Sequence, residues 1–253
     1  MAGVSADAAV PPCELLEWDS EHFGFPIARV LADTLTESSV EEIDAWCIDQ
    51  GIRCLYFVAA PDESETSRLA AAHGFQVVDV RIITRRSYEG LLDLNQGPEE
   101  VRLREATDTD LEYARRLAAR AHHSSRFYFD GRFPKERCDA LYEAWVERAV
   151  RDPERRVLIP VVDGEPVGFY LLAPFGPGTE GHGELVAIDE RHRGKGYARA
   201  MYFGAYRYCA ERGVRKQRGV YSYRNLTAIR LHEKIGFLID EVQVWHHKWY
   251  GGG

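Results

Sequence analysis

The sequence predicts an α/β fold of the α+β type, built as two related halves. Segments with the alternation of half-buried strands are interleaved with segments of helical periodicity. In the last third, an apolar strand leads through a glycine-containing turn into a helix. A helix, a Gly-Phe pair and a long strand follow one another in both halves. Because sheets bury their apolar faces against helices, we expect helical layers on a sheet.

Composition is typical of a globular protein. The chain has 253 residues, 45% hydrophobic and 28% charged, and a net charge of −8. We expect no signal peptide, because the first residues lack its basic and apolar regions, and no apolar run approaches the roughly 20 residues that span a bilayer. We therefore expect a cytoplasmic protein without membrane partners. The acidic balance also argues against nucleic-acid binding as its main role, and a homodimer is left open.

The five cysteines indicate neither a disulfide framework nor a zinc site, because they are odd in number and form no CxxC pair. We expect buried thiols and no metal at Cys13, Cys47, Cys54, Cys138 and Cys209. His122 and His123 have no third ligand at a suitable spacing, so they are expected to end a helix.

The first half begins after a mobile arm, residues 1–12. A capping-box pattern opening at Ser38 predicts a helix that ends at Gly51. The elements expected after it are a strand at 55–60, a short helix at 63–73 and a long strand at 77–88. Residues 13–88 thus form the first half, and residues 89–100, rich in turn formers, are the expected linker.

The second half, residues 101–250, carries more elements. We expect strands at 101–106, 157–162, 166–175, 184–188, 218–223 and 242–250, and helices from Thr107 to His122, from about Pro134 to Arg151, up to Arg212, and after Asn225. Residues 124–133 read as a loop. Asp163 and Gly164 predict a hairpin turn, and Pro160 implies a bulge or a sheet edge beside it.

The end of each half repeats. Residues 67–88 fall on residues 229–250 without a gap, with both Gly-Phe pairs superimposed. Any strand, helix and strand unit can share this pattern. The alternative is that the fold occurs twice and that the first copy, which lacks the glycine turn, has lost its cofactor site.

A turn suited to phosphate lies in the second half. Gly194 and Gly196 allow close approach of backbone N–H groups at a helix start, where the dipole favours anions. The surrounding stretch from Arg191 to Arg230 is locally basic, and a Walker A loop is excluded because no Gly-Lys-Ser/Thr follows. The sequence therefore predicts a polyanionic ligand, such as a diphosphate.

The segments 184–214 and 224–237, ELVAIDERHRGKGYARAMYFGAYRYCAERGV and RNLTAIRLHEKIGF, strongly resemble the GNAT superfamily of acetyl-CoA-dependent N-acetyltransferases. The resemblance implies the GNAT fold, a mixed, mostly antiparallel sheet flanked by helices, with a degenerate GNAT-like N-terminal half. It also implies acetyl-CoA as cosubstrate. The implied cofactor-binding residues are Val186, Ile188, Arg191, Arg193, Gly194, Lys195, Gly196, Tyr197, Ala198 and Asn225.

More loosely, residues 17–24, 124–133 and 140–150 resemble bacterial dTDP-fucosamine (4-amino-4,6-dideoxygalactose) acetyltransferases. This resemblance implies a dTDP-linked 4-amino-4,6-dideoxy sugar as the amine acceptor. Arginines would meet its diphosphate and aromatic rings would stack on its base or sugar, with core packing as the alternative for the rings. The candidate substrate-binding residues are Trp18, Phe23, Arg126, Phe127, Tyr128, Phe129 and Arg132.

Transfer to an amine needs a proton acceptor and a group that protonates the leaving thiolate. GNAT members usually have a tyrosine acid at the position of His232. The acid here is either His232, with a near-neutral pKa, or a nearby tyrosine, Tyr221 or Tyr223. The alternative for His232 is that it is only a packed helix residue. His182 and Glu184 alternate with Val186 and are expected on one face. Glu184 is the first choice for the base, with His182 passing the proton out.

Two other functions stay open at this point. The chain could acetylate proteins or peptides, although the large N-terminal half fits a small-molecule pocket better. It could also bind CoA or a sugar nucleotide without catalysis, since the usual tyrosine is missing.

Overall fold

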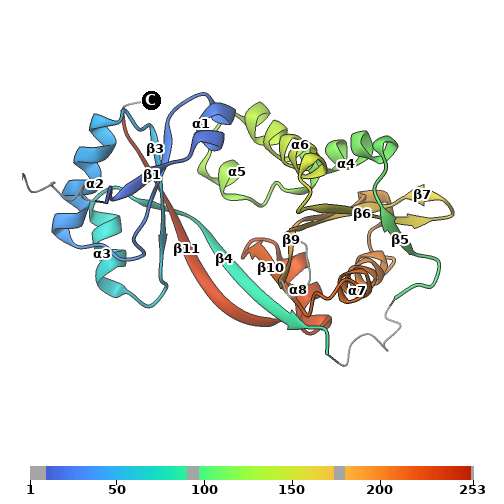
Figure 1. Ribbon diagram of the computed structural model, residues 1–253. Coiled ribbons are helices and arrows are strands. Elements are labelled where there is room, and N and C mark those ends of the chain that lie inside the picture. Colours follow the sequence, from blue (N-terminus) through green and yellow to red (C-terminus); the bar gives the residue numbers. More distant parts are fainter. Residues whose placement is uncertain (1–9, 90–96, 174–179, 252–253) are drawn as a thin grey trace, which may run out of the picture. The chain divides into compact units, whose positions relative to one another are not determined.

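The computed structural model describes residues 10–89, 97–173 and 180–251. The chain divides into two compact units (Figure 1). Unit 1 comprises residues 1–80 and 243–253, and unit 2 comprises residues 81–242. The sequence instead predicts residues 81–88 in the first half and residues 243–250 in the second half. The units differ because the end of β4 (Gln76–Ser87) pairs with unit 2, and the end of β11 (Leu238–Trp249) pairs with unit 1.

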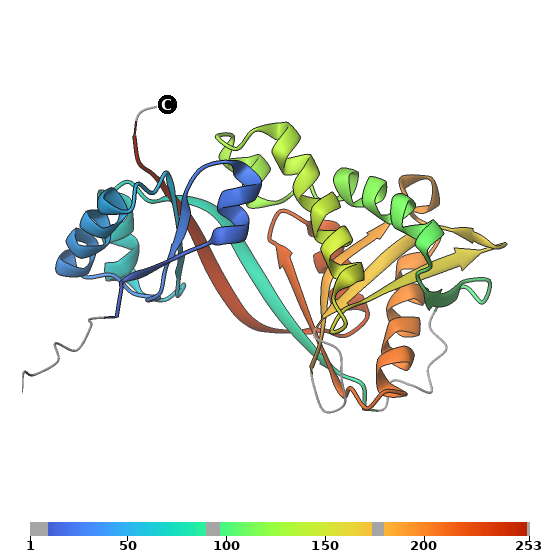
Figure 2. The same cartoon turned by 45° about the horizontal axis from the view of Figure 1, so that its top comes forward.

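Unit 1 is a small α/β layer structure. Its strands run in the order β1 (Cys13–Leu15), β2 (Ile27–Val30), β3 (Cys54–Ala59) and β11, and only β2 and β3 are parallel. Helices α2 (Glu37–Asp49) and α3 (Ser64–Ala72) lie on one side of the strands, whereas α1 (Glu17–Phe23) lies on the other (Figures 1 and 2). Leu55 and Phe57 of β3 share a buried core with Ile43 of α2 and Leu69 of α3.

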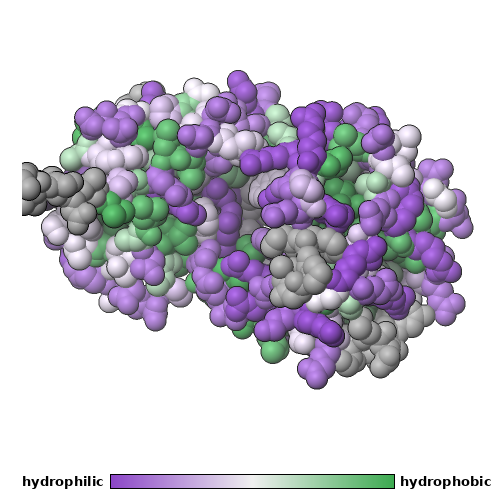
Figure 3. Space-filling model, in the orientation of Figure 1, coloured by the Kyte–Doolittle hydropathy of each residue, from purple (hydrophilic) through white to green (hydrophobic). Residues whose placement is uncertain are grey.

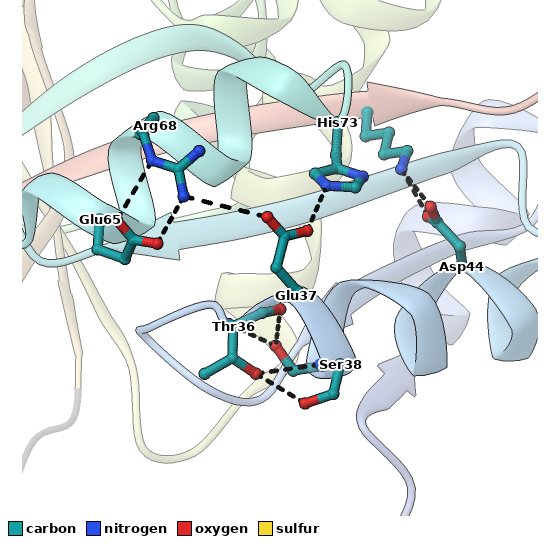
Figure 4. Close-up of polar contacts among 9 residues, drawn as sticks. Thr36, Glu37, Ser38, Asp44, Glu65, Arg68 and His73 are labelled. Carbon is teal, nitrogen blue, oxygen red and sulfur yellow. Dashed lines mark hydrogen bonds and ion pairs between the residues drawn. The ribbon is translucent and has the colours of Figure 1, made fainter.

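Polar contacts hold α2 at its start and near its middle (Figure 4). Thr36 is its N-cap: its hydroxyl accepts from the Ser39 N–H at 3.1 Å, and the Ser39 hydroxyl accepts from the Thr36 N–H at 2.8 Å. The capping box therefore opens two residues before the expected Ser38, because Ser39 can reciprocate only from the third helical position. Asp44 accepts from Lys248 Nζ at 2.6 Å, which ties α2 to β11.

Unit 2 has the mixed, mostly antiparallel sheet expected of the fold. Its order is β4, β10, β9, β8, β6 and β5, with β7 beside β6, and only β9 and β10 are parallel. The strands are β5 (Arg102–Glu105), β6 (Arg156–Val162), β7 (Glu165–Pro166), β8 (Gly168–Ala173), β9 (Glu180–Ile188) and β10 (Lys216–Ser222). Its helices are α4 (Asp108–Ala121), α5 (Arg126–Asp130), α6 (Lys135–Arg151), α7 (Tyr197–Ala210) and α8 (Leu226–Lys234), with a 3-10 turn η1 (Glu190–His192).

Helices cover both faces of the unit 2 sheet. Figure 1 shows α4, α5 and α6 above the strands and α7 and α8 below them. On the α7 face, Tyr170 and Leu172 of β8 pack in one buried cluster with Met201 and Tyr206. We call the opposite side the α6 face, because Trp145 and Arg155, from α6 and the turn after it, reach β9 there.

Two local expectations are confirmed and one is wrong. Leu158 of β6 pairs with Tyr170 of β8, whereas Val161 of β6 pairs with Pro166 of β7, so the register changes by one residue between these two pairs. The predicted bulge is therefore present opposite Pro160. All five cysteines are buried thiols. Residues 124–133 are not wholly loop, because α5 forms within them and ends at Gly131 in the left-handed conformation (φ 75°).

The repeat extends to structure. The bounds of α3 and β4 fall without a gap on those of α8 and β11. Each helix ends in the same motif: the Phe75 N–H donates to the Ala70 carbonyl and the Phe237 N–H to the His232 carbonyl, both at 2.9 Å. This shared geometry supports two copies of one fold.

Among the described residues, no helix has the length and apolar character to cross a bilayer. Hydrophilic side chains are spread over much of the face drawn in Figure 3.

Candidate functional site

The glycine turn leads directly into α7. Gly194 (φ 79°) and Gly196 (φ 81°) are both left-handed, and Gly196 is the N-cap of the helix. The first helical bond runs from the Ala200 N–H to the Gly196 carbonyl at 3.2 Å, so the preceding amides have no acceptor inside the helix. Together with the helix dipole, these amides form a fitting cradle for a diphosphate.

Charged side chains around this turn differ in what they already contact. Arg193 Nε donates to the Ile188 carbonyl at 3.1 Å and ties the turn to the end of β9. Arg191 pairs with Asp189 at 2.8 Å, and this contact holds the pKa of Asp189 near 2. The predicted cation Arg191 is thus partly neutralised, whereas Lys195 Nζ lies 5.9 Å from the Tyr197 ring centroid.

Strands β9 and β10 separate beside the turn. Their pairing ends at Gly183 and Gly219, after which β9 follows β8 and β10 follows β4. The Asp189 N–H bonds the Val167 carbonyl on the β8 side. Backbone groups alternate along a strand, so those of Val186 and Ile188 point to the β10 side, where no described strand pairs with them. An extended ligand with amide groups fits along this edge.

A β-bulge at Glu184 corrects one expectation. Leu171 pairs with Leu185 while Leu172 pairs with Gly183, so Glu184 is an extra residue on β9. Val186 and Ile188 pack with the α7 cluster, whereas the bulge turns His182 to the opposite face. The expectation that His182, Glu184 and Val186 share one face is therefore wrong, because strict alternation does not survive a bulge.

Glu184 is held by donors that sequence reasoning missed. Arg155 reaches both carboxylate oxygens at 3.1 Å, and Trp145 Nε1 donates to one of them at 3.2 Å. The partnership raises the pKa of Arg155. Both carboxylate oxygens of Glu184 are thus already engaged by these donors. No sequence signal links residues that lie so far apart along the chain.

His182 lies beside Glu184 on β9, paired directly opposite Arg218 of β10. Burial lowers its pKa, and the Arg218, Arg81 and Arg155 charges lower it further, against the opposing effect of Glu184. The imidazole is therefore neutral near pH 7 and able to accept a proton.

His232 of α8 is enclosed. It is 3% exposed, its Nε2 lies 2.8 Å from the Tyr202 hydroxyl and its Nδ1 3.3 Å from the Thr84 hydroxyl. Burial lowers its pKa to about 4, which corrects the near-neutral pKa expected for an acid at this position. Both ring nitrogens are engaged, so the packed alternative describes its surroundings.

Of the two candidate tyrosines, only Tyr221 lies beside His232. Their ring centroids are 4.8 Å apart, and burial raises the pKa of Tyr221. Tyr223 is 43% exposed and contacts Arg224. Asn225 caps α8 as expected, its side chain accepting from the Ala228 N–H at 3.1 Å.

The candidate acceptor residues of α5 point in different directions. Phe127 is buried and meets Phe133 edge-on at 5.2 Å, in line with core packing. Arg126 is also buried, at 8% exposure, whereas Phe129 is 55% exposed with the Arg224 guanidinium 3.6 Å over its ring. The Tyr128 hydroxyl donates to Asp139 at 2.6 Å.

Three other candidate acceptor residues lie outside α5. Arg132 is exposed near Asp130. Trp18 and Phe23 belong to unit 1, where Trp18 stacks on His22 at 5.5 Å and Phe23 is buried. Their role at the acceptor stays a prediction.

His122 ends α4 as expected. Its ring stacks on Tyr142 at 4.7 Å, and burial lowers its pKa to about 4. Within the described residues no group of three side chains could hold a metal ion.

The comparisons agree with this geometry. Residues 112–237, all inside unit 2, match the sequence model of the Acetyltransferase (GNAT) family. No curated protein matches the chain. Residues 112–237 are thus a GNAT acetyltransferase domain.

Solved structures share the fold over most of the chain. A GCN5-related N-acetyltransferase from Sphaerobacter thermophilus is 20% identical, with TM-score 0.63 over 95% of this chain and 77% of its own. One from Kribbella flavida is 16% identical, with TM-score 0.63 over 96% and 89%. A tandem GNAT protein from the clavulanic acid biosynthesis pathway is 14% identical, with TM-score 0.57 over 90% and 76%, and supports the two-half architecture.

Proposed function

We propose that the protein transfers an acetyl group from acetyl-CoA to the primary amine of a small molecule, by direct attack in a ternary complex. The observation that carries this proposal is the junction of the glycine turn with the separated edges of β9 and β10. The turn amides would hold the pyrophosphate, and the backbone of Val186 and Ile188 would pair with the pantetheine. Bound acetyl-CoA supplies the acyl group as an activated thioester.

The chain's own groups then handle protons on two sides of the strand edges. On the α6 face, neutral His182 accepts the proton that the attacking amine loses, with Glu184 and Arg155 positioning it. On the α7 face, Tyr221 donates a proton to the leaving thiolate, since His232 is enclosed by Tyr202 and Thr84.

The base assignment predicts a pH effect. His182 must be neutral, and burial places its pKa below the ordinary 6.5, so wild-type kcat should fall as the pH drops through that lowered pKa. We expect His182→Gln to lower kcat by about 10²- to 10⁴-fold and to remove this acidic limb. Glu184→Gln is the matched comparison and should keep the limb. A limb unchanged in His182→Gln would show that another group accepts the proton.

For the acceptor, we propose a dTDP-linked 4-amino-4,6-dideoxy sugar. The exposed Phe129 ring beneath Arg224 is a suitable platform for a base, and Arg126 brings a cation to an acidic protein that must bind a diphosphate. This proposal rests on the residues of α5 and on the loose resemblance of its segment.

Kinetics on a dTDP-amino sugar test that acceptor. Phe129→Ala and Arg126→Ala should each lower kcat/KM by roughly 10- to 100-fold, because a stacking surface or a charged donor is lost. Arg116→Ala, which removes an exposed arginine of α4 outside the candidate site, is the control and should change little. Acetylation of peptides or simple amines but not of any sugar nucleotide would show that the acceptor assignment is wrong.

A further inference from the structure

A row of arginines crosses the α6 face of the unit 2 sheet. Arg218 of β10 pairs opposite His182 on one side and opposite Arg85 on the other. Residues directly opposite one another in neighbouring strands project to the same face. Arg81 pairs with Ser222, four residues beyond Arg218, and so shares this face as well.

These cations differ in how they are neutralised. Arg85 contacts Glu180 at 3.0 Å and Asp240 at 2.7 Å. Arg155 is held by Glu184 and Asp152. Arg218 forms no ion pair in the described part of the chain, and its buried Nε has no hydrogen-bond partner there. Arg218, directly opposite His182, thus brings a positive charge that pairs with no carboxylate in the described part of the chain.

A cation without a counter-ion is costly where water is scarce. Arg218 is partly buried, and a guanidinium there loses hydration that an anion or several acceptors would replace. Arg218 lies directly opposite His182 in the pairing of β9 with β10, and the Arg218 and Arg81 charges both lower the pKa of His182. A bound anion would complete this arrangement and would stand next to the group proposed to accept the amine's proton.

We propose that Arg218, with Arg81 beside it, binds a phosphoryl group of the acceptor and thereby sets the amine at His182. Arg218 and His182 lie on neighbouring strands, which are about 4.8 Å apart. An anion bound to Arg218 and an amine at His182 are therefore separated by about the width of one sugar ring. A hexose with its phosphate on C1 and its amine on C4 meets this requirement. The inference rests on the proposed function and adds the residues that select for a phosphorylated amino sugar. The phosphoryl group belongs either to a sugar 1-phosphate or to a nucleoside diphosphate sugar.

Three acceptors that differ only in the anion test it: 4-amino-4,6-dideoxygalactose, its 1-phosphate and its dTDP-linked form. Arg218→Met should lower kcat/KM for the two phosphorylated acceptors by about 10- to 100-fold. The same variant should leave the neutral sugar within about threefold, and Arg218→Lys should recover part of the loss. Arg85→Met removes an arginine from the same face and is the matched control. Its effect on kcat/KM should be the same for all three acceptors. A preference for the dTDP-linked form over the 1-phosphate would identify the nucleotide sugar as the source.

An equal fall for all three acceptors, or no fall, would overturn the inference. If the wild-type protein acetylates none of them, the acceptor proposal fails, and the anion site is tested separately. Protein saturated with acetyl-CoA, so that the α7 turn is filled, is then titrated with inorganic pyrophosphate by calorimetry. Binding that Arg218→Met abolishes would support the anion site, and absence of binding to the wild type would refute it.

Discussion

Replacing Gly196 by valine should raise the dissociation constant for acetyl-CoA at least about 100-fold while the protein remains folded. Gly196 has φ 81°, a conformation that β-branched residues avoid. A Cβ there would also lie 3.3 Å from both Cγ and Cδ of Pro98, which leaves little room for relaxation. The valine would therefore move the amides that start α7, and with them the proposed pyrophosphate cradle.

Calorimetry with acetyl-CoA and thermal unfolding should be measured on the same samples. The matched control is Gly164→Val in the β6–β7 turn, where φ is 84° and a Cβ would meet no atom within 4 Å. Gly164→Val imposes the same backbone strain at a site away from α7. The affinity of this variant for acetyl-CoA should therefore equal that of the wild type. If Gly196→Val binds acetyl-CoA as tightly as the wild type does, the pyrophosphate does not lie in this turn.

Local chemistry explains what the sequence could predict. The glycine turn, the Asn225 cap and the Gly-Phe helix ends each depend on neighbours within a few residues, so pattern alone locates them. Features that depend on pairing between distant segments could not be predicted from the sequence. The bulge at Glu184 is visible only once β8 lies beside β9, and the Glu184–Arg155 contact joins distant segments.

Burial likewise has no local signature. The sequence left open whether His232 acts as the acid or only packs, and the space that it fills is provided by Gly219 of the distant β10: a Cβ on that glycine would lie 2.5 Å from the Cε1 of His232. The resulting enclosure by Tyr202 and Thr84 sets its protonation. The bounds of the compact units differ from the expected halves for a related reason, because the end of β4 pairs with β10 in unit 2 and the end of β11 pairs with β3 in unit 1.

Two histidines give a second large effect, a loss of stability in acid. Burial lowers the pKa of His122 and of His232 from 6.5 to about 4. Protons then bind the unfolded chain more tightly than the folded one, so the free energy of unfolding is fully present above about pH 6.5 and falls as the pH drops toward 4. A shift of this size corresponds to about 3 kcal/mol per histidine.

His122 allows a clean measurement, because its ring stacks on Tyr142 and its Nε2 has no hydrogen-bond partner among the described residues. His122→Phe keeps a ring against Tyr142 but cannot titrate. Between pH 7 and pH 5 its free energy of unfolding, from urea denaturation, should fall by roughly 2 kcal/mol less than that of the wild type. The exposed neighbour gives the control, since His123→Phe should leave the wild-type slope unchanged. Identical slopes for His122→Phe and the wild type would mean that His122 is protonated as readily in the folded protein as in the unfolded chain.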